Sequence, residues 1–337
     1  MNATTSPSSY SHPEPTGDDR TARPDGDGPH ERALVIAGGG AAGNAWALGV
    51  IAGLAEAGVD LSSADLVVGT SSGSTVAAQV TGERTPAEWY ASILSEPPQR
   101  RPGGRHAEPG SAPRPAERRE APRGPASGIS GQSYLDWSNA IIAASSDPAD
   151  LRRRIGAAAL ARAEAEGRPE GRNRWREVVA ARLPDAHWPQ RRVLITAVDA
   201  RSGEPVLFDR HGGVELIDAV AASTSAMIPY PIGEHRYLNG SYRRGENADL
   251  AAGYGRVLVL VPFGGRTRTP LAWGMDLATQ VAELHAGGSR VETVLPDERT
   301  RELFDANALD PTTRLPAARG GHAQGRTIAA RIAELWN

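Results

Sequence analysis

The sequence predicts an α/β fold with a mainly parallel central sheet that is covered by helices on both faces. Residues 33–37, 66–68 and 256–263 form short and almost continuously apolar runs, as the buried strands of a parallel sheet do. Each of the first two runs is followed by a segment with helical spacing. The order strand–helix–strand–helix favours parallel pairing, because the helix returns the chain to the same end of the sheet.

The first helix follows the strand at 33–37. Trp46, Val50 and Leu54 recur at helical spacing, and Gly58 stands where such a helix would end. A second helix is expected directly after Ser71. These two strand–helix units form the amino-terminal half of the predicted sheet.

A third helix begins with a capping box, since Thr85 is followed by Pro86 in the first turn and by Glu88 three residues after the cap. Residues 191–209 predict two strands joined by a turn at Ser202-Gly203. Further helices are expected at residues 134–144, 148–166, 174–183, 213–223, 271–285 and 325–336. No internal repeat is visible.

Two polar stretches interrupt the predicted order. Residues 1–31 have no apolar run and are expected to form a disordered tail, followed by one α/β domain at 32–337. Residues 96–128 are dense in Pro, Gly and Arg and predict a disordered insert within that domain. The insert reads either as a solvated linker or as a basic arm that touches anionic lipid headgroups.

The composition excludes several classes of function. A net charge of −3 and a pI near 6.3 provide no basic field for nucleic acid. The chain has no cysteine and no lysine, which excludes disulfides, thiolate catalysis, Schiff bases and Walker-type phosphate loops. We expect no metal and no cofactor. Without a membrane span or a signal peptide, a soluble cytoplasmic protein is expected.

A glycine-rich turn, Gly38 to Gly43, follows the first strand and opens the first helix, and two interpretations compete for it. A dinucleotide-binding turn would need an acidic residue at the end of the next strand, but that strand ends in Gly69 and Asp60 precedes it. The alternative is an oxyanion hole formed by the backbone N–H groups of Gly38, Gly39 and Gly40. That interpretation requires a nucleophile on a neighbouring strand.

The segment GTSSG supplies the nucleophile. Gly69, Ser71 and Gly73 match the G-x-S-x-G elbow, in which a strained turn lifts a serine above the edge of the sheet. The N–H of Ser72 would then point at the same oxyanion position. A serine hydroxyl still needs a group that takes its proton, and a Ser–acid–His order could be met by Ser71 with Asp249 and either His285 or His322. Neither histidine follows a strand in a recognisable turn.

A third segment, RYLNGSYRRGENADLA, offers another answer. Together with GGGAAG, GTSSG and AASTSAMIPYPI, it makes residues 33–263 resemble the patatin-like phospholipases. The resemblance implies a three-layer α/β sandwich and an acyl hydrolase with a serine–aspartate dyad, in which Ser71 is the nucleophile and Gly38 to Gly40 form the oxyanion loop. The aspartate of the family's Asp-Gly-Gly or Asp-Gly-Ala motif is replaced here by Asn239, in Asn239-Gly240-Ser241.

This replacement bears on the chemistry, because a carboxamide can orient a hydroxyl but cannot accept its proton. His235 lies four residues earlier on an expected strand, about 13 Å away at roughly 3.3 Å per residue, and is too distant to act as the base. Three hypotheses follow: a weak hydrolase, a catalytically inactive lipid-binding or regulatory protein, or deamidation of the Asn-Gly pair to aspartate. An engineered replacement of an aspartate would give the same sequence.

The sequence therefore predicts a lipid acyl hydrolase that acts through Ser71, with Asn239 in the position of the base. The substrate would be a lipid or phospholipid ester, and transient contact with a membrane surface is compatible with it. Headgroup, acyl-chain length and oligomeric state are open at this stage.

Overall fold

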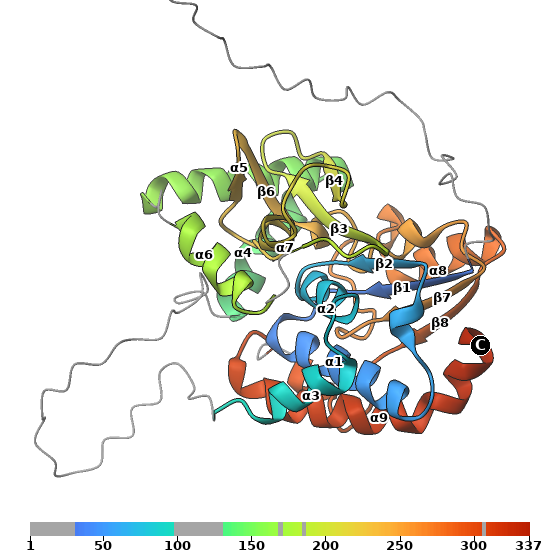
Figure 1. Cartoon of the computed structure of the whole chain (residues 1–337). Coiled ribbons are helices and arrows are strands. Elements are labelled where there is room, and N and C mark those ends of the chain that lie inside the picture. The colour runs from blue at the N-terminus through green and yellow to red at the C-terminus, as the bar shows by residue number, and fades with distance from the viewer. Residues whose placement is uncertain (1–30, 98–130, 168–170, 184–186, 305–307) are drawn as a thin grey trace, which may run out of the picture.

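The computed structural model describes residues 31–97, 131–167, 171–183, 187–304 and 308–337 (Figure 1). The tail expected at 1–31 and the insert expected at 96–128 lie outside these residues, apart from their edge positions 31, 96 and 97. Within the described ranges, the chain forms a mixed sheet with helices on both faces, as predicted.

The sheet has the strand order β5-β6-β3-β2-β1-β7-β8, and β4 pairs with β3. Strands β3, β2, β1, β7 and β8 are parallel, whereas β4 and β6 run antiparallel to β3, and β5 runs antiparallel to β6. The strands are β1 (Arg32–Ile36), β2 (Leu66–Gly69), β3 (Arg192–Asp199), β4 (Pro205–Phe208), β5 (Tyr230–Ile232), β6 (His235–Asn239), β7 (Arg256–Leu260) and β8 (Arg290–Val294). Strands β5 and β8 were not expected from the sequence.

The helices follow the predicted order closely. They are α1 (Gly40–Glu56), α2 (Ser72–Val80), α3 (Pro86–Leu94), α4 (Gly131–Ala144), α5 (Pro148–Glu166), α6 (Gly171–Ala180), α7 (Leu216–Ser223), α8 (Leu277–Ala286) and α9 (Arg314–Trp336). The capping box of α3 is formed between Thr85 and Glu88. Among the described helices, none is both long and apolar enough to cross a membrane.

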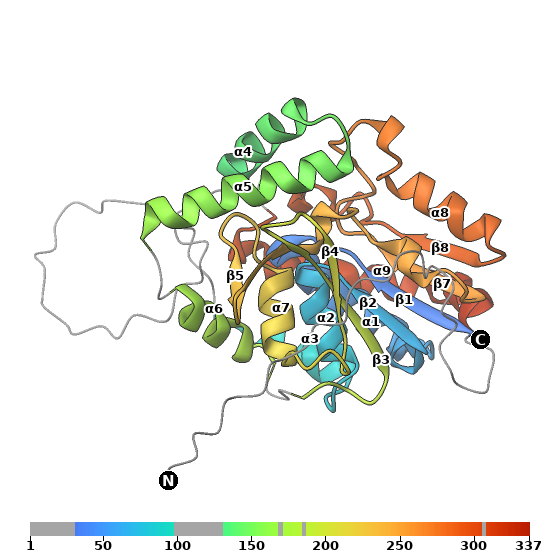
Figure 2. The same cartoon turned by 90° about the horizontal axis from the view of Figure 1, so that it is seen from above.

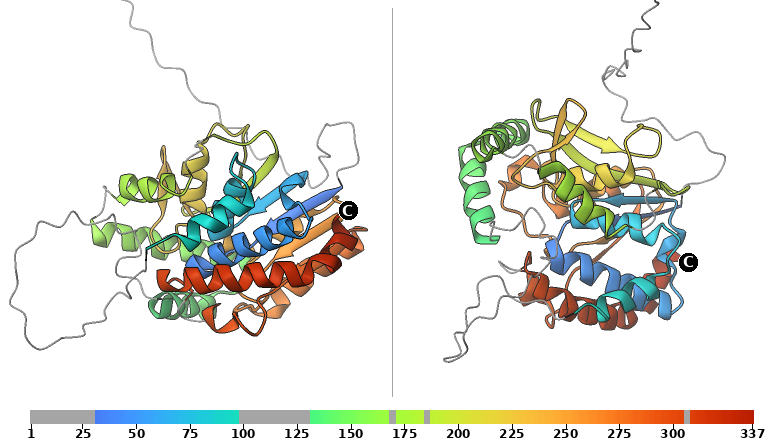
Figure 3. Two further views of the ribbon diagram at one scale, coloured as in Figure 1. Left: turned by 60° about the horizontal axis from the view of Figure 1, so that its bottom comes forward. Right: turned by 60° about the vertical axis from the view of Figure 1, so that its left-hand side comes forward.

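Several predicted helices differ from the structure by about three residues at an end, and two differ more in extent. The helix expected at 271–285 is divided into a short 3-10 helix (Leu271–Trp273) and α8, because Gly274 adopts a left-handed conformation between them. The helix expected at 325–336 begins eleven residues earlier, at Arg314. Glycines such as Gly320 and Gly321 are unfavourable inside a helix, but α9 lies alongside α1 (Figure 3), and Gln324 accepts a hydrogen bond from the Trp46 indole at 3.0 Å.

Side chains of β1 alternate between two buried layers. Leu34 and Ile36 pack with α1, α2, α3, α7 and α9 in the larger layer. Ala33 and Val35 pack with α8 and the short 3-10 helix Ala248–Ala251 on the opposite face. A third cluster joins α5 to β3 and β6, with α4 packed against it, and Figure 2 shows α4 and α5 side by side.

This topology determines where a site can form. Strand β1 pairs with β2 on one side and with β7 on the other, so the loops after β1 and β2 leave the sheet at the same edge. In open α/β sheets, ligands bind at the carboxyl ends of the strands where neighbouring connections diverge. The predicted glycine-rich turn and the predicted elbow both lie at this edge.

Candidate active site

Ser71 occupies a strained turn between β2 and α2. Its backbone has φ 55° and ψ −127°, a conformation that is costly for any residue other than glycine. The turn is held by hydrogen bonds, since the Ser71 N–H donates to Ser223 Oγ at 2.9 Å, and the Ser71 carbonyl accepts from the Ser74 N–H and hydroxyl. The half-buried Ser71 side chain lines a pocket. Ser223 was not singled out from the sequence.

The glycine-rich turn meets the elbow directly. A Cβ atom added to Gly38 would lie 2.9 Å from Ser71 Cβ, which is closer than side-chain carbons approach. A side chain at residue 38 would therefore displace the serine. Because Gly38 has no side chain, the backbone after β1 can pack directly against Ser71, as the oxyanion interpretation requires.

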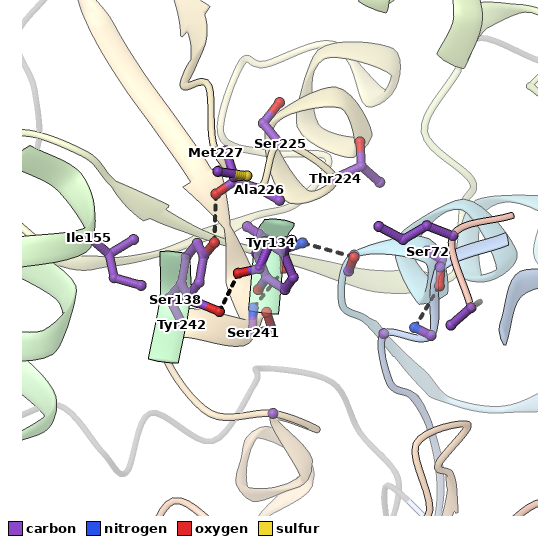
Figure 4. Close-up of a pocket in the computed structure, with 18 of the residues that line it drawn as sticks. Ser72, Tyr134, Ser138, Ile155, Thr224, Ser225, Ala226, Met227, Ser241 and Tyr242 are labelled. Atoms are coloured by element: carbon purple, nitrogen blue, oxygen red, sulfur yellow. Dashed lines mark hydrogen bonds between the residues drawn. The ribbon is translucent and has the colours of Figure 1, made fainter. Parts of the chain in front are cut away.

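The predicted oxyanion donors are not equivalent. The Gly39 N–H donates to Ser72 Oγ at 2.9 Å and is thereby engaged (Figure 4). The N–H groups of Gly38, Gly40 and Ser72 have no acceptor in the part of the chain that the structure describes. Gly40 and Ser72 are the first residues of α1 and α2, whose first turns contain no acidic residue, so the positive ends of both helices are uncompensated by an acidic side chain of their own. Open amides at such ends can stabilise an oxyanion.

Asn239 ends β6 and lies against the serine. Its Nδ2 donates to Ser71 Oγ at 2.9 Å, and its Oδ1 accepts from the Ser241 N–H at 3.0 Å. The Asn239 N–H donates to the Ser225 carbonyl at 2.8 Å, so the residue is fixed at backbone and side chain. The structure thus brings the three predicted motifs together. The contact orients the hydroxyl but leaves its proton without an acceptor on Asn239.

A buried network of polar side chains holds the residues next to Ser71 and Asn239 in place. Asn247 is fully buried, and its Nδ2 donates to Thr70 Oγ1 at 3.0 Å and to the Gly240 carbonyl at 3.1 Å. Thr196 Oγ1 donates to Thr70 Oγ1 at 3.0 Å. The network connects Thr70, the residue before Ser71, with Gly240, the residue after Asn239. Sequence reasoning missed it, because isolated threonines and asparagines carry no recognisable signal.

The other candidate bases have partners elsewhere. Asp249 pairs with Arg243 and Arg244, and the Nδ1 atom of His285 lies 3.1 Å from the Ser289 carbonyl. His322 pairs with Glu56 and stacks on Tyr90. His235 contacts Asp199 at the far end of β6. None of these four residues lines the pocket of Ser71.

The pocket in front of Ser71 has a volume of about 1400 Å³. Its walls are largely apolar, with Leu135 and Ile142 from α4, Ile155 from α5, and Met227 and Ile228 from the loop before β5. Figure 4 shows Ile155 and Met227 among the residues of these walls. Apolar walls that converge on a few polar groups are typical of binding sites for small organic ligands. A pocket of this volume and polarity is suited to a large, mostly apolar ligand.

One pocket residue carries a buried carboxyl group that the sequence did not indicate. Glu246 is 7% exposed, and its pKa is raised to about 7 because burial penalises the carboxylate. Gln280 Nε2 donates to Glu246 Oε2 at 3.0 Å, which lowers the pKa but does not offset burial. The described residues contain no cluster of His, Asp and Glu side chains suited to a metal ion.

The comparison with known families agrees with this geometry. The family model described as patatin-like phospholipase matches residues 34–252, which is more than half of the chain. The chain belongs to the patatin-like phospholipase family. A search of curated protein sequences finds no match. The matched range contains the glycine-rich turn with Gly43, the elbow with Gly69 and Gly73, and the Asn239-Gly240 pair.

Proposed function

We propose that this patatin-like protein is a serine acyl hydrolase of lipid esters, with a turnover limited by Asn239. The observation that carries the proposal is the meeting of three groups: the strained Ser71, the open amides of Gly38, Gly40 and Ser72, and the side chain of residue 239. The family supports lipid esters as the substrate class.

In the proposed reaction, Ser71 Oγ attacks the ester carbonyl and forms a tetrahedral oxyanion near the open amides. Collapse of this intermediate breaks the bond to the leaving alcohol and leaves an acyl group on Ser71. Water then attacks the acyl-enzyme, releases the fatty acid and restores the hydroxyl. The serine proton passes to water or to the leaving oxygen, because the Asn239 amide has no proton-accepting atom directed at Ser71.

The second candidate is a lipid-binding protein of the same fold without turnover. The Asn239 amide favours it, because an N–H donated to Ser71 Oγ occupies a lone pair with which the serine would attack. Either function uses the same pocket, and they differ only in whether a bond to Ser71 forms.

The structure weighs against the deamidation hypothesis. Deamidation requires the Gly240 nitrogen to attack the Asn239 side-chain carbon, but both ends of that side chain are held by hydrogen bonds. Gly240 is also wedged against β3, where an added Cβ would lie 2.0 Å from Thr196 Oγ1. Ring closure would therefore require local unfolding, and we propose that residue 239 remains asparagine in the folded protein.

The test is active-site labelling followed by turnover. An alkyl fluorophosphonate forms a covalent bond to an activated serine, and mass spectrometry of the peptide containing Ser71 detects it. We expect labelling of the wild type, none of Ser71→Ala, and slow hydrolysis of p-nitrophenyl esters. Lipid that co-purifies with a protein whose Ser71 is never labelled would favour the binding protein.

A further inference from the structure

Glu246 lies close to the catalytic centre without taking part in the chemistry described above. It precedes Asn247, whose side chain touches both Thr70 and the Gly240 carbonyl, the neighbours of Ser71 and Asn239. Glu246 and Ser71 line the same pocket. A ligand with its ester at Ser71 can therefore extend to Glu246.

The Glu246 carboxyl has no cationic partner in the described part of the chain. Its Oε2 accepts from the neutral Gln280 amide, and the remaining donor is its own backbone N–H. Gln280 is itself fully buried and held by the Met275 carbonyl and the Ala248 N–H, so its amide cannot turn away.

The charged neighbours of Glu246 are already engaged. Arg243 pairs with Asp249, and Arg244 pairs with both Asp249 and Glu283. Asp276, which caps α8, adds negative charge that raises the Glu246 pKa further. Burial of an ionised carboxyl without a counter-charge is strongly unfavourable. The local charge is thus balanced only when a proton or a ligand cation is present.

We propose that Glu246 is the subsite for an ammonium group in the substrate, so that the preferred esters carry an amine or quaternary ammonium headgroup. This inference rests on the proposed function for the ester at Ser71. The apolar walls bind the acyl chain, and Glu246 supplies the counter-charge for the headgroup. A headgroup that carried an anion at this subsite would meet the acidic side chains of Glu246 and Asp276, whereas the arginines of the pocket lie among its other lining residues.

The subsite has a characteristic pH dependence. A cation binds the carboxylate form, and with a pKa of about 7 the ionised fraction of Glu246 rises about tenfold between pH 6 and pH 8. Affinity for a quaternary ammonium ligand should rise with pH by about the same factor. A neutral ligand of the same shape should show no such rise.

The experiment measures binding in the full chain carrying Ser71→Ala, so that hydrolysis plays no part. The probes are the dodecyl ether of choline and its neutral isostere, the dodecyl ether of 3,3-dimethylbutanol, titrated calorimetrically below their aggregation concentrations at pH 6 and pH 8. We expect Glu246→Gln to weaken the choline ether at least tenfold at pH 8 and to abolish its pH dependence. The neutral ether should bind both proteins equally.

Glu246→Gln retains an oxygen acceptor for Gln280, so the fold should be kept, and circular dichroism checks this. Glu164→Gln is the matched control, because Glu164 is a pocket-lining but exposed carboxylate on α5 and its removal should change neither affinity. Unchanged binding of the choline ether to Glu246→Gln would overturn the proposal, as would an equal loss for both ethers. Failure of Ser71 labelling would refute the enzyme but leave this binding result intact.

Discussion

Replacing Asn239 by aspartate exchanges the Nδ2 amide group that contacts Ser71 Oγ for a carboxylate oxygen. In the present structure, Nδ2 donates to Ser71 Oγ at 2.9 Å and Oδ1 accepts from the Ser241 N–H at 3.0 Å. A carboxylate in the same place accepts from both groups without moving. The serine hydroxyl would then donate toward residue 239 and free its lone pairs for attack.

The expected gain follows from the value of a positioned base. General-base help accelerates a reaction by about 10²–10⁴, which is about 3–5 kcal/mol of activation free energy. Two hydrogen-bond donors would stabilise the carboxylate, although residue 239 is only 6% exposed. We therefore expect Asn239→Asp to raise kcat/KM by at least 10² and to add an ionisation to the pH–rate profile that the wild type lacks.

The assay is hydrolysis of a p-nitrophenyl acyl ester by four proteins: wild type, Asn239→Asp, Asn239→Ala and Asn239→Asp with Ser71→Ala. Asn239→Ala should stay within about tenfold of the wild type, because it removes orientation but no base. The dyad would be refuted by an Asn239→Asp protein whose Ser71 reacts with the fluorophosphonate but whose kcat/KM rises less than threefold. Full activity in the double variant would refute it as well.

Three further outcomes are expected. Gly240→Ala should destabilise the fold by about 1–3 kcal/mol in urea denaturation, because the new Cβ would lie 2.0 Å from Thr196 Oγ1, whereas Gly245→Ala, with open space around it, should cost less than 1 kcal/mol. Ser71→Gly should be more stable than Ser71→Ala by about 1 kcal/mol, since only glycine relieves the strain at φ 55°; equal stabilities would show that the elbow is unstrained. The pKa of the Glu246 carboxyl is about 7 in the folded protein and near 4.5 in the unfolded chain, so the folded state holds this proton more tightly. The free energy of unfolding of the wild type should therefore fall by about 3 kcal/mol as the pH rises from 4.5 to beyond 7. Glu246→Gln should lack this decline in denaturant titrations at pH 5 and pH 8, and an identical decline in both proteins would exclude Glu246 as its source.

The fold was predictable because its signals are local. Continuous apolar runs such as Leu66–Val68 mark buried strands, and the box at Thr85 and Glu88 marks a helix start. The limits of α9 were not predictable in this way. Glycines near residue 320 indicate a loop by local preference, yet the helix continues because small residues let it pack closely against α1.

The candidate site likewise has features that local sequence predicts and features that depend on the tertiary structure. Its motifs could be read from the sequence, because a serine between glycines after a strand has a local geometric reason. Three properties of the site could not be predicted from the sequence. They are the hydrogen bond from the Gly39 N–H to Ser72 Oγ, the hydrogen bond from the Ser71 N–H to Ser223 Oγ, and the burial of Glu246. Each depends on residues that are far apart along the chain.

By itself, the sequence predicted the order of the helices and of most strands, marked Ser71 as the candidate nucleophile, and showed that residue 239 is an asparagine, which cannot accept a proton. Tertiary structure alone decided that the Asn239 amide reaches Ser71 Oγ, and that the Glu246 carboxyl lines the same pocket with no cationic partner among the described residues. The physical reason is that backbone preference acts between near neighbours, whereas hydrogen bonding and desolvation depend on what the completed fold places around each group.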